Sequence, residues 1–117
     1  MTTDASLLAE SKSIRADFRE AVNMSPSEIE TWLNTPESQD VGYKDENGAE
    51  SVGHASGRYI IELLRKRVDD LSADDLAHMR KVVGYVHRHL AQRPAEMEES
   101  RWRYSLMNWG HDPMRDQ

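Results

Sequence analysis

Six basic residues in the middle of the chain have the types and spacing expected for contacts with phosphate groups: Arg65, Lys66, Arg67, Arg80, Lys81 and Arg88. The first three end one predicted helix, and the last three belong to the next, where positions 76–93 contain no acidic residue. Exposed lysine and arginine side chains supply most of the non-specific affinity for nucleic acid. Cations in the last turn of a helix also complement its dipole, so a purely structural role stays open.

A second candidate for anion binding is the segment SVGHASG, which spans residues 51–57. It lies at the start of a predicted helix, where unpaired backbone N–H groups bind phosphate in many proteins. The residues expected to take part are Ser51, Gly53 and His54. The alternative is that Gly53 and Gly57 only allow close packing between helices, and the pattern favours this alternative.

The histidines show no spacing typical of a metal site. No His-x-x-x-His or Glu-x-x-His pair occurs, so no two ligands lie on adjacent turns of one helix face. His78 and His89 share a face but lie roughly 16 Å apart along the axis. The chain also has no cysteine and no Gly-x-Ser-x-Gly motif. We therefore expect no metal site, no cofactor and no enzymatic activity.

Length and composition indicate one small domain. The chain has 117 residues, of which 38% are hydrophobic, and a formal net charge of -6. No apolar run is long enough to span a membrane and no secretory signal is visible, so we expect a soluble, cytoplasmic protein without membrane contact. The net charge is -7 for residues 1–57, +3 for 58–93 and -2 for 94–117, which leaves one basic region in an acidic chain.

The elements that must position these residues are helices. Capping signals occur at Ser25 with Glu28 and at Ser72 with Asp75, and Gly110 has the position of a C-terminal stop. No segment alternates with period two for long enough to form a strand. The expected helices cover residues 4–23, 26–33, 52–68, 73 to just before Pro94, and 95 or 98 to 108. This predicts an all-α domain of four to five helices, with an acidic N-terminal helix, an aromatic C-terminal helix, a polar loop at 35–50 and frayed ends at 1–6 and 114–117.

Apolar residues at helical spacing predict which helix faces are buried. The expected stripes are Leu7, Leu8, Ile14, Phe18 and Val22 in the first helix, Ile60, Ile61, Leu64 and Val68 in the third, and Leu76, Met79, Val83, Val86 and Leu90 in the fourth. In the last helix Trp102 and Trp109 could stack on bases, with Arg101 and Arg103 on phosphates. The favoured interpretation places both tryptophans in the core, with one of these arginines over a ring.

Three stretches carry a resemblance to a known family: residues 50–58, residues 78–94, and residues 101–113 with the string WRYSLMNWGHDP. Together they resemble an uncharacterised family of small bacterial and fungal proteins whose members are commonly given the automatic label "DNA-binding protein". The resemblance covers about residues 18–114. It implies an all-helical single domain and favours nucleic acid as a partner, and it brings no catalytic residue and no cofactor.

Our leading hypothesis is a small non-enzymatic module that binds nucleic acid through the six cations. A helix-turn-helix is not expected. The N-terminal end of the fourth helix would have to enter the groove, and it carries or directly follows four carboxylates that duplex phosphates would repel: Asp69, Asp70, Asp74 and Asp75. The alternative is a protein-interaction or stress-associated adaptor, in which the acidic first half docks a basic protein partner through Glu28, Glu30 and Glu37.

Overall fold

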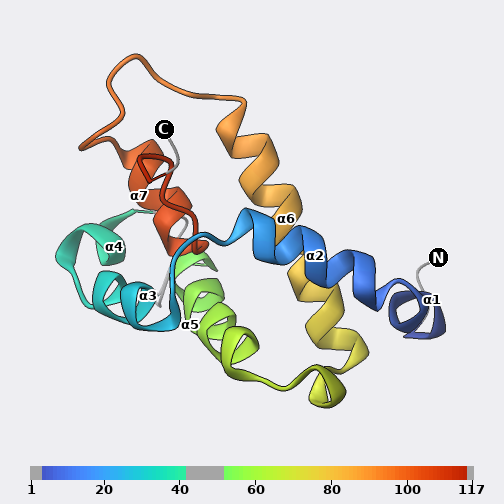
Figure 1. The fold of residues 1–117 in the computed structure, drawn as a ribbon. Helices are drawn as coiled ribbons and strands as arrows, with labels where there is room; N and C mark the ends of the chain where they lie inside the picture. Colours follow the sequence, from blue (N-terminus) through green and yellow to red (C-terminus); the bar gives the residue numbers. More distant parts are fainter. Residues whose placement is uncertain (1–3, 42–51, 116–117) are drawn as a thin grey trace.

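The computed structural model describes residues 4–41 and 52–115 (Figure 1). Over these ranges the chain forms α-helices and one short 3-10 helix, and no strand. The elements are α1 (Asp4–Ala9), α2 (Ser11–Ala21), α3 (Pro26–Leu33), α4 (Pro36–Asp40), α5 (Val52–Arg65), the 3-10 helix η1 (Val68–Asp70), α6 (Ala73–Leu90) and α7 (Arg101–Asn108). The expected all-α single domain is confirmed.

Both predicted capping boxes are present. At the start of α3 the backbone N–H of Glu28 donates to the Ser25 hydroxyl at 3.1 Å, and the Ser25 N–H donates back to the Glu28 carboxylate at 2.9 Å. Ser72 and Asp75 make the same reciprocal pair at the start of α6. Gly110, with φ of +81°, ends the last helical segment as predicted. The predicted cap Ser51 lies outside the described residues.

Asp75 does more than cap α6. Its buried carboxylate accepts hydrogen bonds from the Tyr59 hydroxyl and the Lys66 ammonium, both at 2.6 Å, in addition to the Ser72 N–H. Burial alone would raise the pKa of Asp75, but these three donors outweigh it and lower the pKa to about 2. The carboxylate therefore joins α5 to α6 in its charged form.

Acid should weaken the fold through Asp75. A carboxyl group whose pKa is lower in the folded than in the unfolded protein stabilises the native state at pH values above its unfolded pKa. This stabilisation is lost as the pH falls from about 4 to 2. We expect Asp75→Asn to be destabilised relative to the unmutated protein by about 2 kcal/mol at pH 6, and this difference to shrink towards pH 2.5. Urea unfolding at both pH values measures it. Asp74→Asn, at the exposed neighbour, is the control. A loss of unfolding free energy in Asp75→Asn that does not change with pH would contradict the lowered pKa of Asp75.

The first predicted helix is divided in two. Instead of one helix over residues 4–23, α1 ends at Ala9 and α2 begins at Ser11, with Glu10 between them. Both short helices pack against α6, which a single straight helix could not do (Figure 1). Leu7 and Ile14 are buried, but Leu8, expected on the same stripe, is 54% exposed. No glycine or proline marks the break, so tertiary packing decides it.

The predicted polar loop at 35–50 starts with a helix. Pro36 occupies the first turn of α4, and the Thr35 hydroxyl caps it by accepting from the Ser38 N–H at 3.1 Å. Asn34, Thr35 and Pro36, interpreted as the stop of α3, therefore also start the next helix. α4 places Ser38 and Val41 in the interior, where both are almost fully buried.

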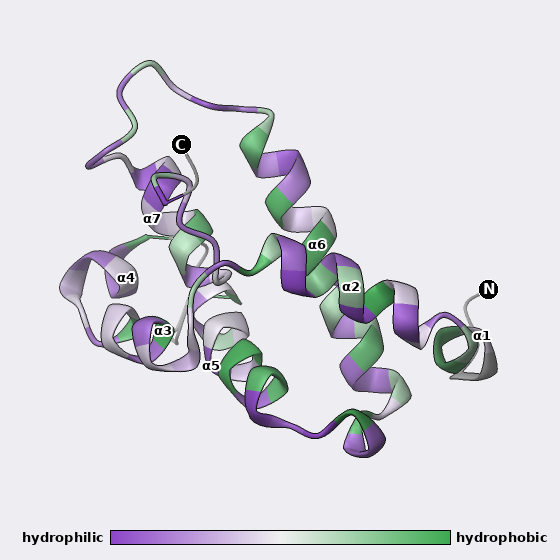
Figure 2. Ribbon diagram, in the orientation of Figure 1, coloured by the Kyte–Doolittle hydropathy of each residue, from purple (hydrophilic) through white to green (hydrophobic). Residues whose placement is uncertain are grey.

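Buried apolar side chains from α1, α2, α3, α5, α6 and α7 form one core. Hydrophobic residues recur along α2, α5 and α6 (Figure 2). α6 is the longest helix, and α2 lies across it while α3 packs on α5. On α6, Val82 is fully buried, whereas Val83 and Leu90 of the predicted stripe are only partly so. α5 ends at Arg65 rather than near Val68, which belongs to η1 and is 44% exposed. None of the described helices is long and apolar enough to cross a membrane.

Candidate anion-binding site

Three of the six predicted phosphate-binding cations are already paired with carboxylates. Lys66 lies 2.6 Å from Asp75, and Arg65 lies 3.3 Å from Glu30. Arg80 forms an ion pair with Glu10 of the α1–α2 junction. The pairs of Arg65 and Arg80 are exposed and contribute little stability, whereas Lys66 binds the buried carboxylate of Asp75; all three pairs reduce the positive charge presented to a phosphate. The basic region of the sequence is therefore smaller in space than in the chain.

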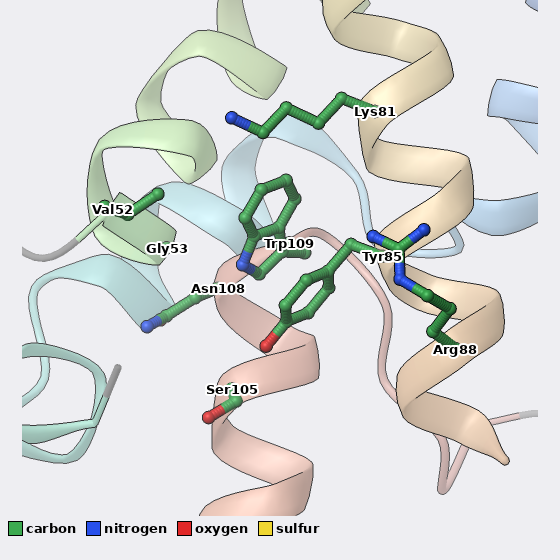
Figure 3. Close-up of a pocket in the computed structure, with 8 residues that line it drawn as sticks. All are labelled: Val52, Gly53, Lys81, Tyr85, Arg88, Ser105, Asn108 and Trp109. Atoms are coloured by element: carbon green, nitrogen blue, oxygen red, sulfur yellow. The ribbon is translucent and has the colours of Figure 1, made fainter. Parts of the chain in front are cut away.

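The other three cations, Arg67, Lys81 and Arg88, form no ion pair with any carboxylate in the described part of the chain. Lys81 and Arg88 stand seven residues apart on α6, which is two turns or about 10.5 Å along the axis. Both line one hollow between α5, α6 and α7 (Figure 3). The structure thus brings two of the six predicted residues to one site.

We call this hollow the α6 pocket. Its volume is about 450 Å³, and it is lined by Val52, Gly53, Lys81, Tyr85, Arg88, Ser105, Asn108 and Trp109. Most of the lining is carbon, and none of the described residues contributes a carboxylate to it. Lys81 and Arg88 extend from α6 on the two sides of the Tyr85 and Trp109 rings (Figure 3). An apolar hollow flanked by two cations favours an anion with an apolar body.

The indole N–H of Trp109 also belongs to the α6 pocket. Trp109 is 4% exposed, and its N–H has no acceptor among the residues that the structure describes. The other two indoles are satisfied, because Trp32 donates to Asn108 Oδ1 at 2.7 Å and Trp102 donates to the His89 carbonyl at 2.6 Å. In the described chain the one fully buried side-chain nitrogen or oxygen atom without a partner is His89 Nε2, so the Trp109 N–H is not sealed in the core but is open to the α6 pocket.

Gly53 keeps the pocket open beside Trp109. A Cβ atom at position 53 would lie 3.1 Å from the Trp109 Nε1 atom, closer than ordinary van der Waals contact. Gly53 thus lets α5 approach Trp109 and Asn108 closely, in keeping with the packing role that the sequence favoured, and the same residue lines the α6 pocket. His54 is placed elsewhere, since its Nε2 atom donates to the Leu33 carbonyl at 2.8 Å. Ser51, the third predicted anion ligand, lies outside the described residues.

A stack of rings holds Tyr85 and Trp109 in place. Neighbouring centroids are 4.2 to 6.2 Å apart, with planes inclined by 11° to 14°. The order through the stack is Tyr59, His78, Trp109, Tyr85, His89, Trp102. Burial lowers the pKa of both histidines, which favours their neutral, stacking forms. The sequence analysis considered Trp109 for base stacking, with Arg101 and Arg103 rather than Lys81 and Arg88, and favoured a core position. It did not assign Tyr85 to a site, although an aromatic residue between Lys81 and Arg88 on one helix was the available signal.

The C-terminal motif makes contacts within the fold. Arg103 pairs with Asp112 through two hydrogen bonds of 3.1 and 3.2 Å, and Arg101 pairs with Asp40. The expectation that one of these arginines lies over a tryptophan ring is therefore wrong. The cation over Trp102 is Arg93, at 6.0 Å. Residues 110–115 then lie against residues 21–28, through His111 Nδ1 and the Ala21 carbonyl, Asp112 N–H and Asn23 Oδ1, and Arg115 and Glu28.

Metal binding finds no support in the described ranges, where no group of three or more histidine, aspartate or glutamate side chains is placed to hold an ion.

The fold and the α6 pocket define a small all-α protein with a candidate site for an organic anion. Residues 17–107 match the model of the family described as "Protein of unknown function (DUF3140)", and the chain belongs to that family. No curated protein and no solved structure matches the chain.

Proposed function

We propose that this protein is a small non-enzymatic module that binds nucleic acid through phosphate contacts from α6. The observation that carries the proposal is the position of Lys81 and Arg88, two cations without a carboxylate partner in the described chain that flank one aromatic hollow. Lysine and arginine on an exposed helix face are the common source of phosphate contacts. The proposal needs fewer residues than the sequence suggested, because Arg65, Lys66 and Arg80 have partners.

Single strands suit this surface better than a duplex. Unpaired bases can insert beside aromatic side chains, and Tyr85 and Trp109, whose faces already stack on neighbouring rings, lie between the two cations. A duplex would also meet exposed carboxylates at Asp69, Asp70 and Asp74, near the start of α6. Two contacts to a single strand correspond to a log–log salt slope of about -1.4, so we expect weak binding with a modest salt dependence.

Fluorescence anisotropy with a labelled single-stranded DNA and its duplex, at about 50 mM salt where phosphate contacts are strong, tests the proposal. We expect Lys81→Glu with Arg88→Glu to weaken binding by at least about tenfold, since two attractions become repulsions. The matched control is Lys12→Glu with Arg19→Glu, which reverses a lysine and an arginine at the same spacing on α2. An unmutated protein that does not bind, or equal losses in the two double variants, would refute the proposal.

The alternative, an adaptor that uses the acidic first half, has less support. Glu28 already binds Arg115, whose guanidinium lowers the pKa of this carboxyl to about 2, and Glu30 binds Arg65. A basic partner protein would have to displace these arginines. Glu37 is exposed, but one carboxylate gives little basis for docking.

A further inference from the structure

We propose that the α6 pocket binds a flat aromatic group that carries one phosphate or carboxylate. The ring would lie against the edges of Tyr85 and Trp109, whose faces are covered by the stack, and the anionic group would be held by Lys81 and Arg88. Both a free aromatic anion and one nucleotide unit of a strand have this chemistry. The inference concerns a small ligand and does not depend on the proposed strand binding.

Size and lining favour an apolar body. Sites for small organic ligands typically measure about 300–1,000 Å³ and are lined mostly by apolar and aromatic side chains. The α6 pocket, at about 450 Å³, falls within this range, and Val52, Tyr85 and Trp109 supply its apolar walls. Tyr85 and Trp109 are stacked at 4.2 Å with nearly parallel planes, so these walls are already ordered without a ligand.

The indole N–H of Trp109 offers a hydrogen-bond donor to a ligand in the α6 pocket. Most of Trp109 is buried, but its N–H is open to the pocket and lies beside Gly53 (Figure 3). Among the described residues no oxygen accepts this hydrogen bond, in contrast to the indoles of Trp32 and Trp102. A ligand oxygen in the pocket would satisfy the donor.

Charge decides between an anion and a cation. The charged side chains of the α6 pocket are Lys81 and Arg88, and both only donate hydrogen bonds. The side-chain oxygen of Asn108 is already used twice, by Trp32 and by Ser38 at 2.6 Å, so it offers little to a donor ligand. A ligand cation would meet two positive charges and no carboxylate, whereas a phosphate or carboxylate would meet two charge-assisted donors.

NMR of the 15N-labelled protein tests the inference with 1-naphthyl phosphate as the probe. The chain has three tryptophans, so its spectrum contains three indole N–H signals, and Trp109→Phe identifies the one that belongs to Trp109. We expect the Trp109 signal to move and saturate during titration, while those of Trp32 and Trp102 move little because both already have acceptors. No saturating shift, or equal shifts of all three signals, would overturn the inference.

Two variants locate the probe. Lys81→Gln with Arg88→Gln should weaken it by at least about tenfold, because two charge-assisted contacts are lost, while Lys12→Gln with Arg19→Gln should leave it unchanged. Gly53→Ala alters no charge, but its Cβ would lie 3.1 Å from Trp109 Nε1 and should also weaken the probe. Thermal unfolding checks that each variant is folded. Unchanged affinity in both the Lys81/Arg88 and the Gly53 variants would refute the site.

Further probes define the ligand and separate the two proposals. 1-Naphthol, which lacks the anion, and inorganic phosphate, which lacks the ring, should each bind at least about tenfold more weakly than 1-naphthyl phosphate; equal binding would overturn the inference. Displacement of the probe by single-stranded DNA would show that the natural ligand of the α6 pocket is a nucleotide of a strand. Probe binding that DNA does not displace would show that the natural ligand is a free aromatic anion. If the DNA binds while the probe does not, the inference fails and the proposed function remains.

Discussion

Replacing Asn108 by leucine is expected to lower the free energy of unfolding by about 3–5 kcal/mol, because several buried polar groups lose their partner at once. Asn108 is fully buried at the end of α7. Its Oδ1 atom accepts from Trp32 Nε1 at 2.7 Å and from the Ser38 hydroxyl at 2.6 Å, and its Nδ2 atom donates to the Ser38 carbonyl at 3.1 Å. One side chain thus joins α3, α4 and α7.

Leucine has the same branched arrangement of four side-chain heavy atoms as asparagine, so the substitution leaves no cavity, and the loss reports the missing hydrogen bonds together with the bulk of the two methyl groups. Urea unfolding followed by circular dichroism gives the free energy. Asn34→Leu is the matched control, since Asn34 is exposed at the end of α3 and should change stability by less than about 1 kcal/mol. A loss below about 1 kcal/mol for Asn108→Leu would show that this hub is not formed.

Gly57→Ala should also destabilise strongly, by about 3 kcal/mol, because a Cβ atom has no room where α5 crosses α7 and α3. An alanine Cβ at position 57 would lie 2.6 Å from the backbone carbonyl oxygen of Asn108 and 2.8 Å from Leu33 Cδ2. The carbonyl belongs to a helix end and cannot move aside alone, so the helices must separate. This expected loss of stability is opposite to the ordinary effect of replacing glycine by alanine within a helix, since alanine favours a helix by roughly 0.5–1 kcal/mol over glycine.

Gly84→Ala provides the contrast within the same protein. A Cβ at position 84 would meet only the end of the flexible Arg88 side chain, at 2.9 Å, which can turn away. We therefore expect Gly84→Ala on α6 to be neutral or slightly stabilising, and urea unfolding of both alanine variants measures the two effects. If the two substitutions had equal effects, close helix packing at Gly57 would not explain either of them.

The helices with local start signals were predictable and those set by packing were not. Ser25 with Glu28 and Ser72 with Asp75 are reciprocal caps that act within four residues, so the sequence shows them directly. The break at Glu10 has no such signal, because it lets α1 and α2 both reach α6, and that requirement is visible only when α6 is in place.

The sequence allowed the six candidate cations to be named, but not which of them lack a carboxylate partner in the folded protein. Arg80 is neutralised by Glu10 and Arg65 by Glu30, from positions 70 and 35 residues away in the chain, and no local pattern reports such pairs. The contact between Tyr85 and Trp109 was not predicted for the same reason. Trp109 follows α7 and meets Tyr85 of α6 only after the long connection between the helices has closed.

The contacts between residues 110–115 and residues 21–28 have a consequence for biosynthesis. Asn23 and Asp112 are 89 residues apart, and Arg115 reaches the Asn23 carbonyl and Glu28 across 92 and 87 residues. Contacts of such long separation close late, because the intervening chain must be ordered first. A nascent chain can therefore form its individual helices on the ribosome, but α3 acquires these partners only when residue 115 has left the exit tunnel.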